Sequence, residues 1–88
     1  MLPGFNHDVR HGGRVFHLQT EDSGVQEARL TTHLFLAGAV VASTRSSYAD
    51  LRGAPDLVPL LRKRMEEQHK SLLRRLVSGE FDSGASAR

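Results

Sequence analysis

Residues 55–79, PDLVPLLRKRMEEQHKSLLRRLVSG, decide the fold, because they carry the clearest helical pattern in the chain. Pro55 suits the first helical position, Asp56 suits the positively polarised start of a helix, and Gly79 suits its C-terminal cap. At about 100° per residue the stretch separates into a charged face and an apolar stripe. The stripe consists of Leu57, Val58, Leu61, Met65, Leu72, Leu73 and Leu76. The sequence therefore predicts one long amphipathic C-terminal helix.

A β-hairpin is predicted near the N-terminus, closed by Gly12 and Gly13, which accept the positive φ angles of tight turns. A two-residue loop at this point pairs Val9 with Phe16, His7 with Leu18 and Asp8 with His17. One face of the hairpin is then apolar, and the other carries polar side chains such as Asn6 and Gln19. The polar run through Arg29 is expected to form a loop.

A second hairpin is predicted from Leu30–Leu36 and Ala39–Tyr48, turning at Ala37-Gly38. That turn places Leu34, Leu36 and Val41 on one face. It pairs Phe35 with Val40 and His33 with Ala42 on the other. Both faces are then apolar near the turn, and a single helix can cover only one of them.

Together these segments predict an α+β fold, a four-stranded antiparallel β-meander followed by one long C-terminal amphipathic helix packed on the sheet. We expect residues 1–79 to form a single ββββα domain and residues 80–88 to form a flexible tail. A chain of 88 residues has a thin core. Any apolar face left uncovered by the helix would favour association with a second molecule.

Composition excludes several classes of function. The chain has no cysteine, which removes disulfides, thiolate metal sites and thiol nucleophiles. No apolar run approaches the length of a membrane span or resembles a signal peptide, so we expect a cytoplasmic protein without membrane association.

Five segments resemble a family of short bacterial proteins found mainly in myxobacteria and other deltaproteobacteria. The motifs are GFNH at 4–7, QTEDSG at 19–24, THLF at 32–35, SYAD at 47–50 and MEEQHK at 65–70. The resemblance extends from Gly4 to about Asp82. Because that family has no established function, the resemblance implies a self-contained fold and assigns no activity, cofactor or site.

The five histidines raise the question of a metal site. His17 beside Asp8 is the best starting point, but His7 is predicted to face the opposite side of the sheet, and a zinc site needs three or four converging ligands. Solvated or singly hydrogen-bonded imidazoles are therefore favoured, and no cofactor is expected. The adjacent carboxylates of Glu21 and Asp22 point to opposite faces of a strand, which favours a turn role for Asp22. With no phosphate-binding loop and no catalytic arrangement, we expect no enzyme activity.

Two polar residues, Gln68 and His69, fall within the apolar stripe of the predicted helix. Buried amide and imidazole groups need hydrogen-bond partners. We expect those partners on the strands, among Thr32, Ser43, Ser47 and Tyr48, in a network that sets the register of the helix on the sheet. A binding or interface role for these groups is the alternative.

The surplus of apolar residues favours a non-enzymatic interaction module that self-associates as a homodimer. Candidate interface residues, taken from both faces of the second hairpin and from the helix stripe, are Phe35, Val40, Leu34, Val41, Leu61, Met65 and Leu72. The alternative hypothesis is a nucleic-acid-binding protein that uses the basic helix face formed by Lys63, Lys70 and Arg74. Glu66 and Glu67 interrupt that face.

Overall fold

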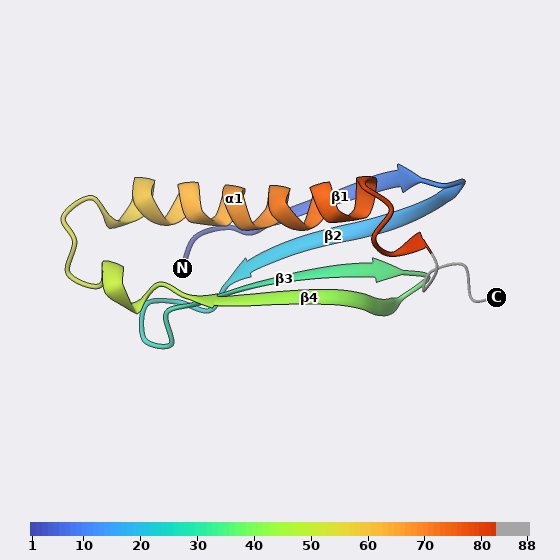
Figure 1. Cartoon of the computed structure of the whole chain (residues 1–88). Coiled ribbons are helices and arrows are strands. Elements are labelled where there is room, and N and C mark those ends of the chain that lie inside the picture. Colours follow the sequence, from blue (N-terminus) through green and yellow to red (C-terminus); the bar gives the residue numbers. More distant parts are fainter. Residues whose placement is uncertain (83–88) are drawn as a thin grey trace.

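The computed structural model describes residues 1–82 and contains one antiparallel sheet and one long helix. The elements are β1 (Phe5–His11), β2 (Arg14–Asp22), β3 (Arg29–Leu36), β4 (Ala39–Ser47), a short 3-10 helix η1 (Ala49–Leu51) and α1 (Leu57–Val77). The four strands are in the order β1-β2-β3-β4, which is a meander. Helix α1 lies along one face of the sheet and leaves the opposite face open (Figure 1). The predicted fold class is confirmed.

The register of the first hairpin is the predicted one. Val9 pairs with Phe16, His7 with Leu18 and Asp8 with His17. Gly12 and Gly13 adopt φ angles of 60° and 76°, which only glycine enters without steric cost. The turn therefore sets which side chains of β1 and β2 face the helix.

The second hairpin departs from the predicted register after the two pairs next to the turn, Leu36 with Ala39 and Phe35 with Val40. Phe35 pairs with Val40 as expected, but a β-bulge between Leu34 and Phe35 shifts the remaining pairs. His33 pairs with Ser43, and the predicted pairing with Ala42 is wrong, because the bulge adds Val41 as an extra residue in β4. The open face is consequently apolar only beside the turn.

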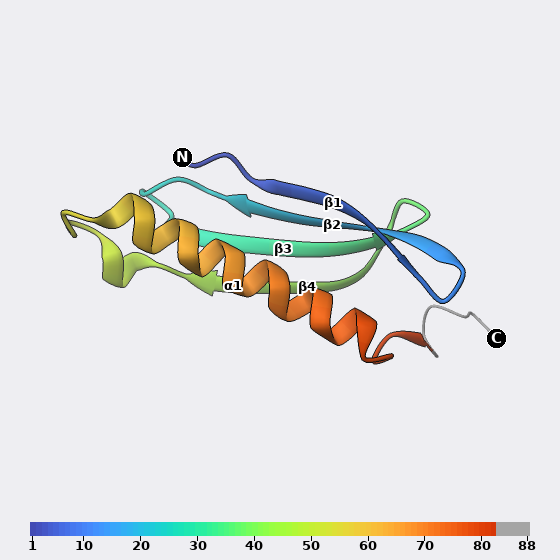
Figure 2. The same ribbon diagram turned by 90° about the horizontal axis from the view of Figure 1, so that it is seen from above.

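Two apolar clusters form the core between the sheet and α1. The first contains Ala28, Leu30, Tyr48, Leu51, Leu61 and Met65 and lies under the first half of α1. The second contains Phe16, Leu18, Leu34, Leu72 and Leu76 and lies under the second half. The helix crosses the strands diagonally (Figure 2). His69, the middle one of the five buried residues of α1, lies between the two clusters.

Both ends of α1 differ in detail from the sequence pattern. The helix begins at Leu57, two residues later than Pro55 suggests, and the side chain of Asp56 makes no capping hydrogen bond. At the C-terminus Gly79 has φ +92°, and the amides of Gly79 and Glu80 donate to the carbonyls of Leu76 and Arg75. This is the Schellman arrangement expected for a glycine after a helix.

The ordered contacts continue past the expected boundary at residue 79. Glu80 pairs with Arg75, Phe81 packs against the second core cluster, and Asp82 contacts His11. Residues 80–82 are thus part of the fold, because Phe81 gains apolar cover by folding back. The rest of the predicted flexible tail, residues 83–88, lies outside the described residues. Within residues 1–82 no helix combines the length and the apolar character needed to cross a membrane.

Candidate functional site

A polar layer separates the two core clusters and ties α1 to the sheet. Gln68 Nε2 donates to Thr32 Oγ1 at 3.0 Å, and Thr32 Oγ1 lies 2.7 Å from Thr20 Oγ1. Thr20 Oγ1 in turn lies 2.8 Å from His69 Nδ1. Gln68, His69 and Thr32 therefore belong to one network, with Thr20 as a member that the sequence did not single out. The alternation of β2 contained the signal, since Thr20 shares the face of Phe16 and Leu18.

The amide of Gln68 has further strand partners. Its Nε2 donates to the Thr44 carbonyl at 3.2 Å, and Ser46 Oγ donates to its Oε1. The expected partners Ser43 and Ser47 do not take part, because they lie on the open face. Among residues 1–82 every fully buried side-chain nitrogen and oxygen has a hydrogen-bond partner. The layer is thus satisfied internally, which is typical of a structural network.

His69 is 5% exposed and meets a second histidine at the edge of the sheet. Its Nε2 lies 2.8 Å from Nδ1 of His7, and Phe5 contacts the ring edge-on. Burial, and secondarily the charge of His7, lowers the pKa of His69, which favours the neutral imidazole. Hollows of about 150 and 270 Å³ flank this pair, both bordered by Lys70.

The groups beside this pair are limited in the part of the chain that the structure describes. Residues 1–82 hold no group of three or more side chains that could bind a metal ion. The hydroxyl nearest to His69, that of Thr20, is fully buried. The two histidines form a hydrogen bond that links β1 to α1.

Tyr48, expected in the helix network, instead bonds to the end of β2. Its buried hydroxyl donates to Asp22, which also accepts from the backbone amides of Leu2 and Gly24 at 2.8 and 2.9 Å. The predicted turn role of Asp22 is present in the bond to Gly24. Burial, together with the carboxylate, raises the pKa of Tyr48 to about 12. Burial alone would raise the pKa of Asp22, but these three hydrogen bonds, together with the positive charge of the N-terminus, outweigh it and the pKa is lowered.

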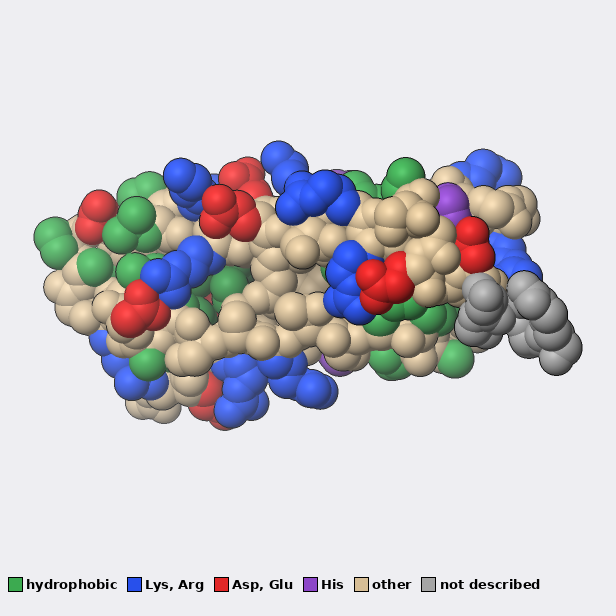
Figure 3. All heavy atoms as spheres, viewed as in Figure 1, with side chains coloured by type: hydrophobic (Ala, Val, Ile, Leu, Met, Phe, Trp, Pro, Cys, Tyr) green, Lys and Arg blue, Asp and Glu red, His purple; other side chains and the backbone are tan. Residues whose placement is uncertain are grey.

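The face of the sheet opposite α1, here called the open face, is graded along the strands. The end beside the two turns, called the apolar end, carries Val15, Phe35 and Val40, with the charged side chains of Arg10 and Asp8 at its outer edge on β1. Farther from the turns the face becomes polar and then charged, with Asn6, Gln19, His33 and Ser43 followed by Glu21, Thr31, Arg45 and Arg29. In Figure 3 lysine and arginine side chains lie both over α1 and along the lower, open side of the sheet. The open face therefore has an apolar end and a charged end.

Phe35 is the only aromatic hydrocarbon ring in the apolar end, and two histidines flank it. The ring centroids of His17 and His33 lie 6.2 and 5.6 Å from that of Phe35. His17 Nδ1 contacts Asp8 at 3.0 Å, and His33 Nδ1 contacts the Ser43 hydroxyl at 2.7 Å. These side-chain contacts hold the three rings side by side on the two central strands.

The interface candidates divide into two groups. Leu34, Leu61, Met65 and Leu72 are buried between sheet and helix, so they offer no surface to a second molecule and their assignment to an interface is corrected. Val41 is half-buried against the second core cluster. Phe35 and Val40 remain on the open face. Strand alternation placed Leu34 and Phe35 on opposite faces, but the sequence did not show which face the helix covers.

The basic residues of α1 also divide. Arg64 pairs with Asp50 and Arg75 with Glu80. Lys63, Lys70 and Arg74 are exposed, and the described residues contain no ion-pair partner for them. Glu66 and Glu67 lie on the same exposed side and reduce its positive potential.

Comparison of the chain with models of known protein families, with curated proteins and with solved structures found no significant match. The resemblance to short bacterial proteins stays a prediction.

Proposed function

We propose that the chain is a non-enzymatic protein-interaction module that self-associates as a homodimer through the open face of its sheet. The observation that carries this proposal is the layering, because α1 covers one face only (Figure 1). On the other face Val40 is 55% and Val15 49% exposed, and Phe35 pairs with Val40 across β3 and β4. A second copy would remove this apolar end from water.

The open face is large enough for a stable interface. The longest strands have nine residues. Strands of that length at about 3.3 Å per residue, set about 4.8 Å apart, give a sheet of roughly 30 by 19 Å. Side chains stand above this plane, so the accessible area exceeds the projected one. The roughly 800 Å² per partner that standard interfaces bury is within reach.

The grading of the face favours one symmetry. A two-fold axis parallel to the strands, between β2 and β3, places the apolar end of one protomer on that of its partner. His17 then faces Phe35 of the partner, because the two residues are paired across β2 and β3. An axis perpendicular to the strands would set the apolar end against the charged end and desolvate charges without compensation.

Sedimentation equilibrium of the full chain at micromolar concentration tests the proposal. We expect a dimer for the native chain and a 9.7 kDa monomer for the double variant Val15→Lys, Val40→Lys. The matched control is Val25→Lys, Val77→Lys, whose valines are 42% and 58% exposed away from the open face. That control should stay dimeric. A native chain that sediments as a monomer refutes the proposal.

A second candidate function, nucleic-acid binding, is supported by the exposed cations of α1. Lys63, Lys70 and Arg74 can neutralise phosphates, and such binding falls steeply with salt. We expect Lys63→Glu, Lys70→Glu to abolish a duplex mobility shift at low salt, with Arg10→Gln on the open face as control. If the native chain gives no shift at low salt, this candidate is eliminated. For the leading proposal we retain a bacterial setting, which the sequence resemblance supports, and a cytoplasmic location, which the lack of a signal-peptide-like or membrane-spanning apolar run supports.

A further inference from the structure

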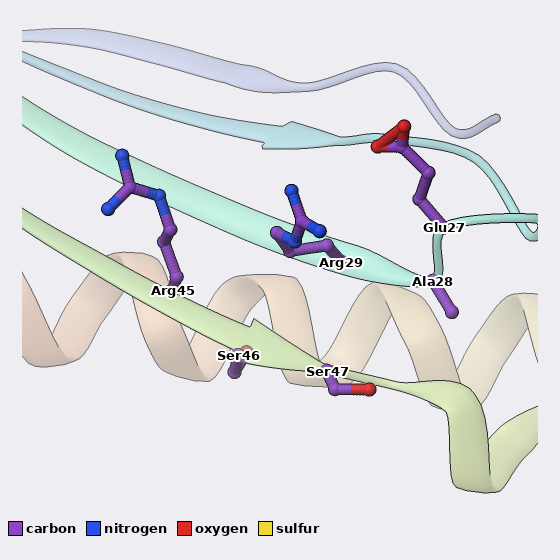
Figure 4. A pocket seen from close by; sticks show the side chains of 6 residues that line it. All are labelled: Glu27, Ala28, Arg29, Arg45, Ser46 and Ser47. Atoms are coloured by element: carbon purple, nitrogen blue, oxygen red, sulfur yellow. The ribbon is translucent and has the colours of Figure 1, made fainter.

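A shallow pocket lies at the charged end of the open face, where β4 leaves the sheet and the turn after β2 enters β3. Its volume is about 300 Å³. The lining residues are Glu27, Ala28, Arg29, Arg45, Ser46 and Ser47 (Figure 4). At about 30 Å³ per water molecule, the pocket has room for roughly ten waters, or for a phosphate group and the first atoms of the molecule that carries it.

Two arginines from neighbouring strands line this pocket. Arg29 pairs with Ser47 and Arg45 with Thr31, so the two arginines are diagonal neighbours on one face. Figure 4 shows both side chains on the side of the sheet turned away from α1. Neither guanidinium makes a hydrogen bond or ion pair with any of residues 1–82, whereas Arg64 is bound to Asp50. Like charges in such positions repel each other, and an anion between them removes the repulsion.

The remaining lining groups define the ligand further. Ser47 Oγ accepts the Ala49 amide at 3.2 Å, which leaves its own proton free to donate. The hydroxyl of Ser46 is bound to Gln68 on the helix side and is not available. Glu27 stands on the other side of the pocket. Its carboxylate repels an anion that the two arginines attract.

We propose that Arg29 and Arg45 form an oxyanion-binding site that takes a phosphate group, either as inorganic phosphate or as the terminal monoester of a larger molecule. Planar guanidinium groups bind phosphate oxygens in pairs of parallel hydrogen bonds, which point charges cannot do. The site lies at a corner of the sheet. Because stacked sheets cross at about 30°, their corners separate, and the pocket stays open to solvent in the proposed dimer.

Amide NMR titration of the full chain with inorganic phosphate, against sodium chloride of equal ionic strength, tests this site. We expect saturable shifts at residues 27–29 and 45–47. Arg29→Gln and Arg45→Gln should each weaken binding by about tenfold or more, because each removes charge-assisted hydrogen bonds. Glu27→Gln should strengthen binding several-fold, since it removes the opposing charge. Arg10→Gln, on the same face outside the pocket, is the control and should leave the affinity unchanged.

Three results would overturn the site: shifts that rise linearly without saturation, an Arg10→Gln loss as large as that of Arg45→Gln, or no gain in Glu27→Gln. A parallel titration with O-phosphoserine separates the two sources. Tighter binding than inorganic phosphate indicates a monoester on a larger molecule, and equal binding indicates free phosphate. The Val15→Lys, Val40→Lys monomer should retain phosphate binding, so failure of the dimer and failure of this site are distinguishable.

Discussion

The hydroxyl pair of Thr20 and Thr32 allows the polar layer under α1 to be tested quantitatively. The two residues are partners across β2 and β3, both are fully buried, and their oxygens are 2.7 Å apart. Valine has nearly the shape of threonine and keeps the β-branch. A double-mutant cycle with Thr20→Val and Thr32→Val therefore removes the hydroxyls with little change in packing.

The magnitude follows from the bonds that each hydroxyl makes. Thr32→Val removes bonds to Thr20 and to Gln68, and Thr20→Val removes bonds to Thr32 and to His69. At about 0.5–1.5 kcal/mol for each of the two bonds, less about 0.8 kcal/mol for the added apolar burial, each single change should cost about 0.2–2.2 kcal/mol. The double variant loses the shared bond only once, so its cost should fall short of the sum by about 1 kcal/mol.

Urea unfolding followed by far-UV circular dichroism, in the Val15→Lys, Val40→Lys background at fixed protein concentration, measures these differences without a contribution from association. Thr31→Val is the matched control, because it changes the same residue type one position away on the open face. It should change the free energy of unfolding by less than about 0.5 kcal/mol. If the two core substitutions add within about 0.3–0.5 kcal/mol, the hydroxyls are not coupled and the described network is refuted.

Three further predictions concern buried side chains. Burial lowers the pKa of His69 below its ordinary 6.5, so the unfolded chain takes up this proton first. The full contribution of His69 to stability is present above the unfolded pKa and is lost as the pH drops toward the lower folded pKa, by at most about 1.4 kcal/mol per pH unit. His69→Gln should therefore flatten the curve of urea midpoint against pH. An unchanged slope contradicts the burial of a neutral His69. The single tyrosine, Tyr48, has its pKa raised to about 12, so the free energy of unfolding falls as the pH rises from 10 to 12. The phenolate absorbance of Tyr48 should appear only together with unfolding. A phenolate transition near pH 10 in the folded chain argues against burial of Tyr48. Met65→Ala should cost about 2–5 kcal/mol by thermal unfolding, against less than about 0.5 kcal/mol for the half-exposed Val58→Ala, and equal costs for the two would disprove the core assignment.

Local rules were sufficient for much of the fold. The Gly12-Gly13 turn set the register of β1 on β2, because the side-chain repeat of a strand is two and the loop length leaves one choice of pairing. Gly79 marked the end of α1 through its positive φ. Gln68 and His69 were expected to bond to the strands because burial of unpaired polar groups is costly, and both do so.

Parts of the candidate site depended on contacts between distant segments. The bulge at Val41 moved Ser43 and Arg45 to the open face. No residue type in β4 predicts this bulge, because a bulge depends on how the two strands and the core pack together. Tyr48 bonds to Asp22 rather than to the helix network, because the partner of its hydroxyl depends on how distant segments of the chain meet. Strand alternation places Asp22 on the face that α1 covers, but only the path of the chain after β4 brings the Tyr48 hydroxyl to it.

The amino-acid sequence by itself determined the strand and helix segments, the first turn and the amphipathic pattern of α1, since each follows from backbone sterics and a short repeat. Only the tertiary structure decided which apolar residues are core and which remain at the surface. Leu34 and Phe35 are neighbours of similar chemistry, yet one is fully buried under α1 and the other stands on the open face. The placement of Arg29 and Arg45 also depended on the tertiary structure. They are diagonal neighbours because antiparallel pairing brings residues far apart in the chain to adjacent positions.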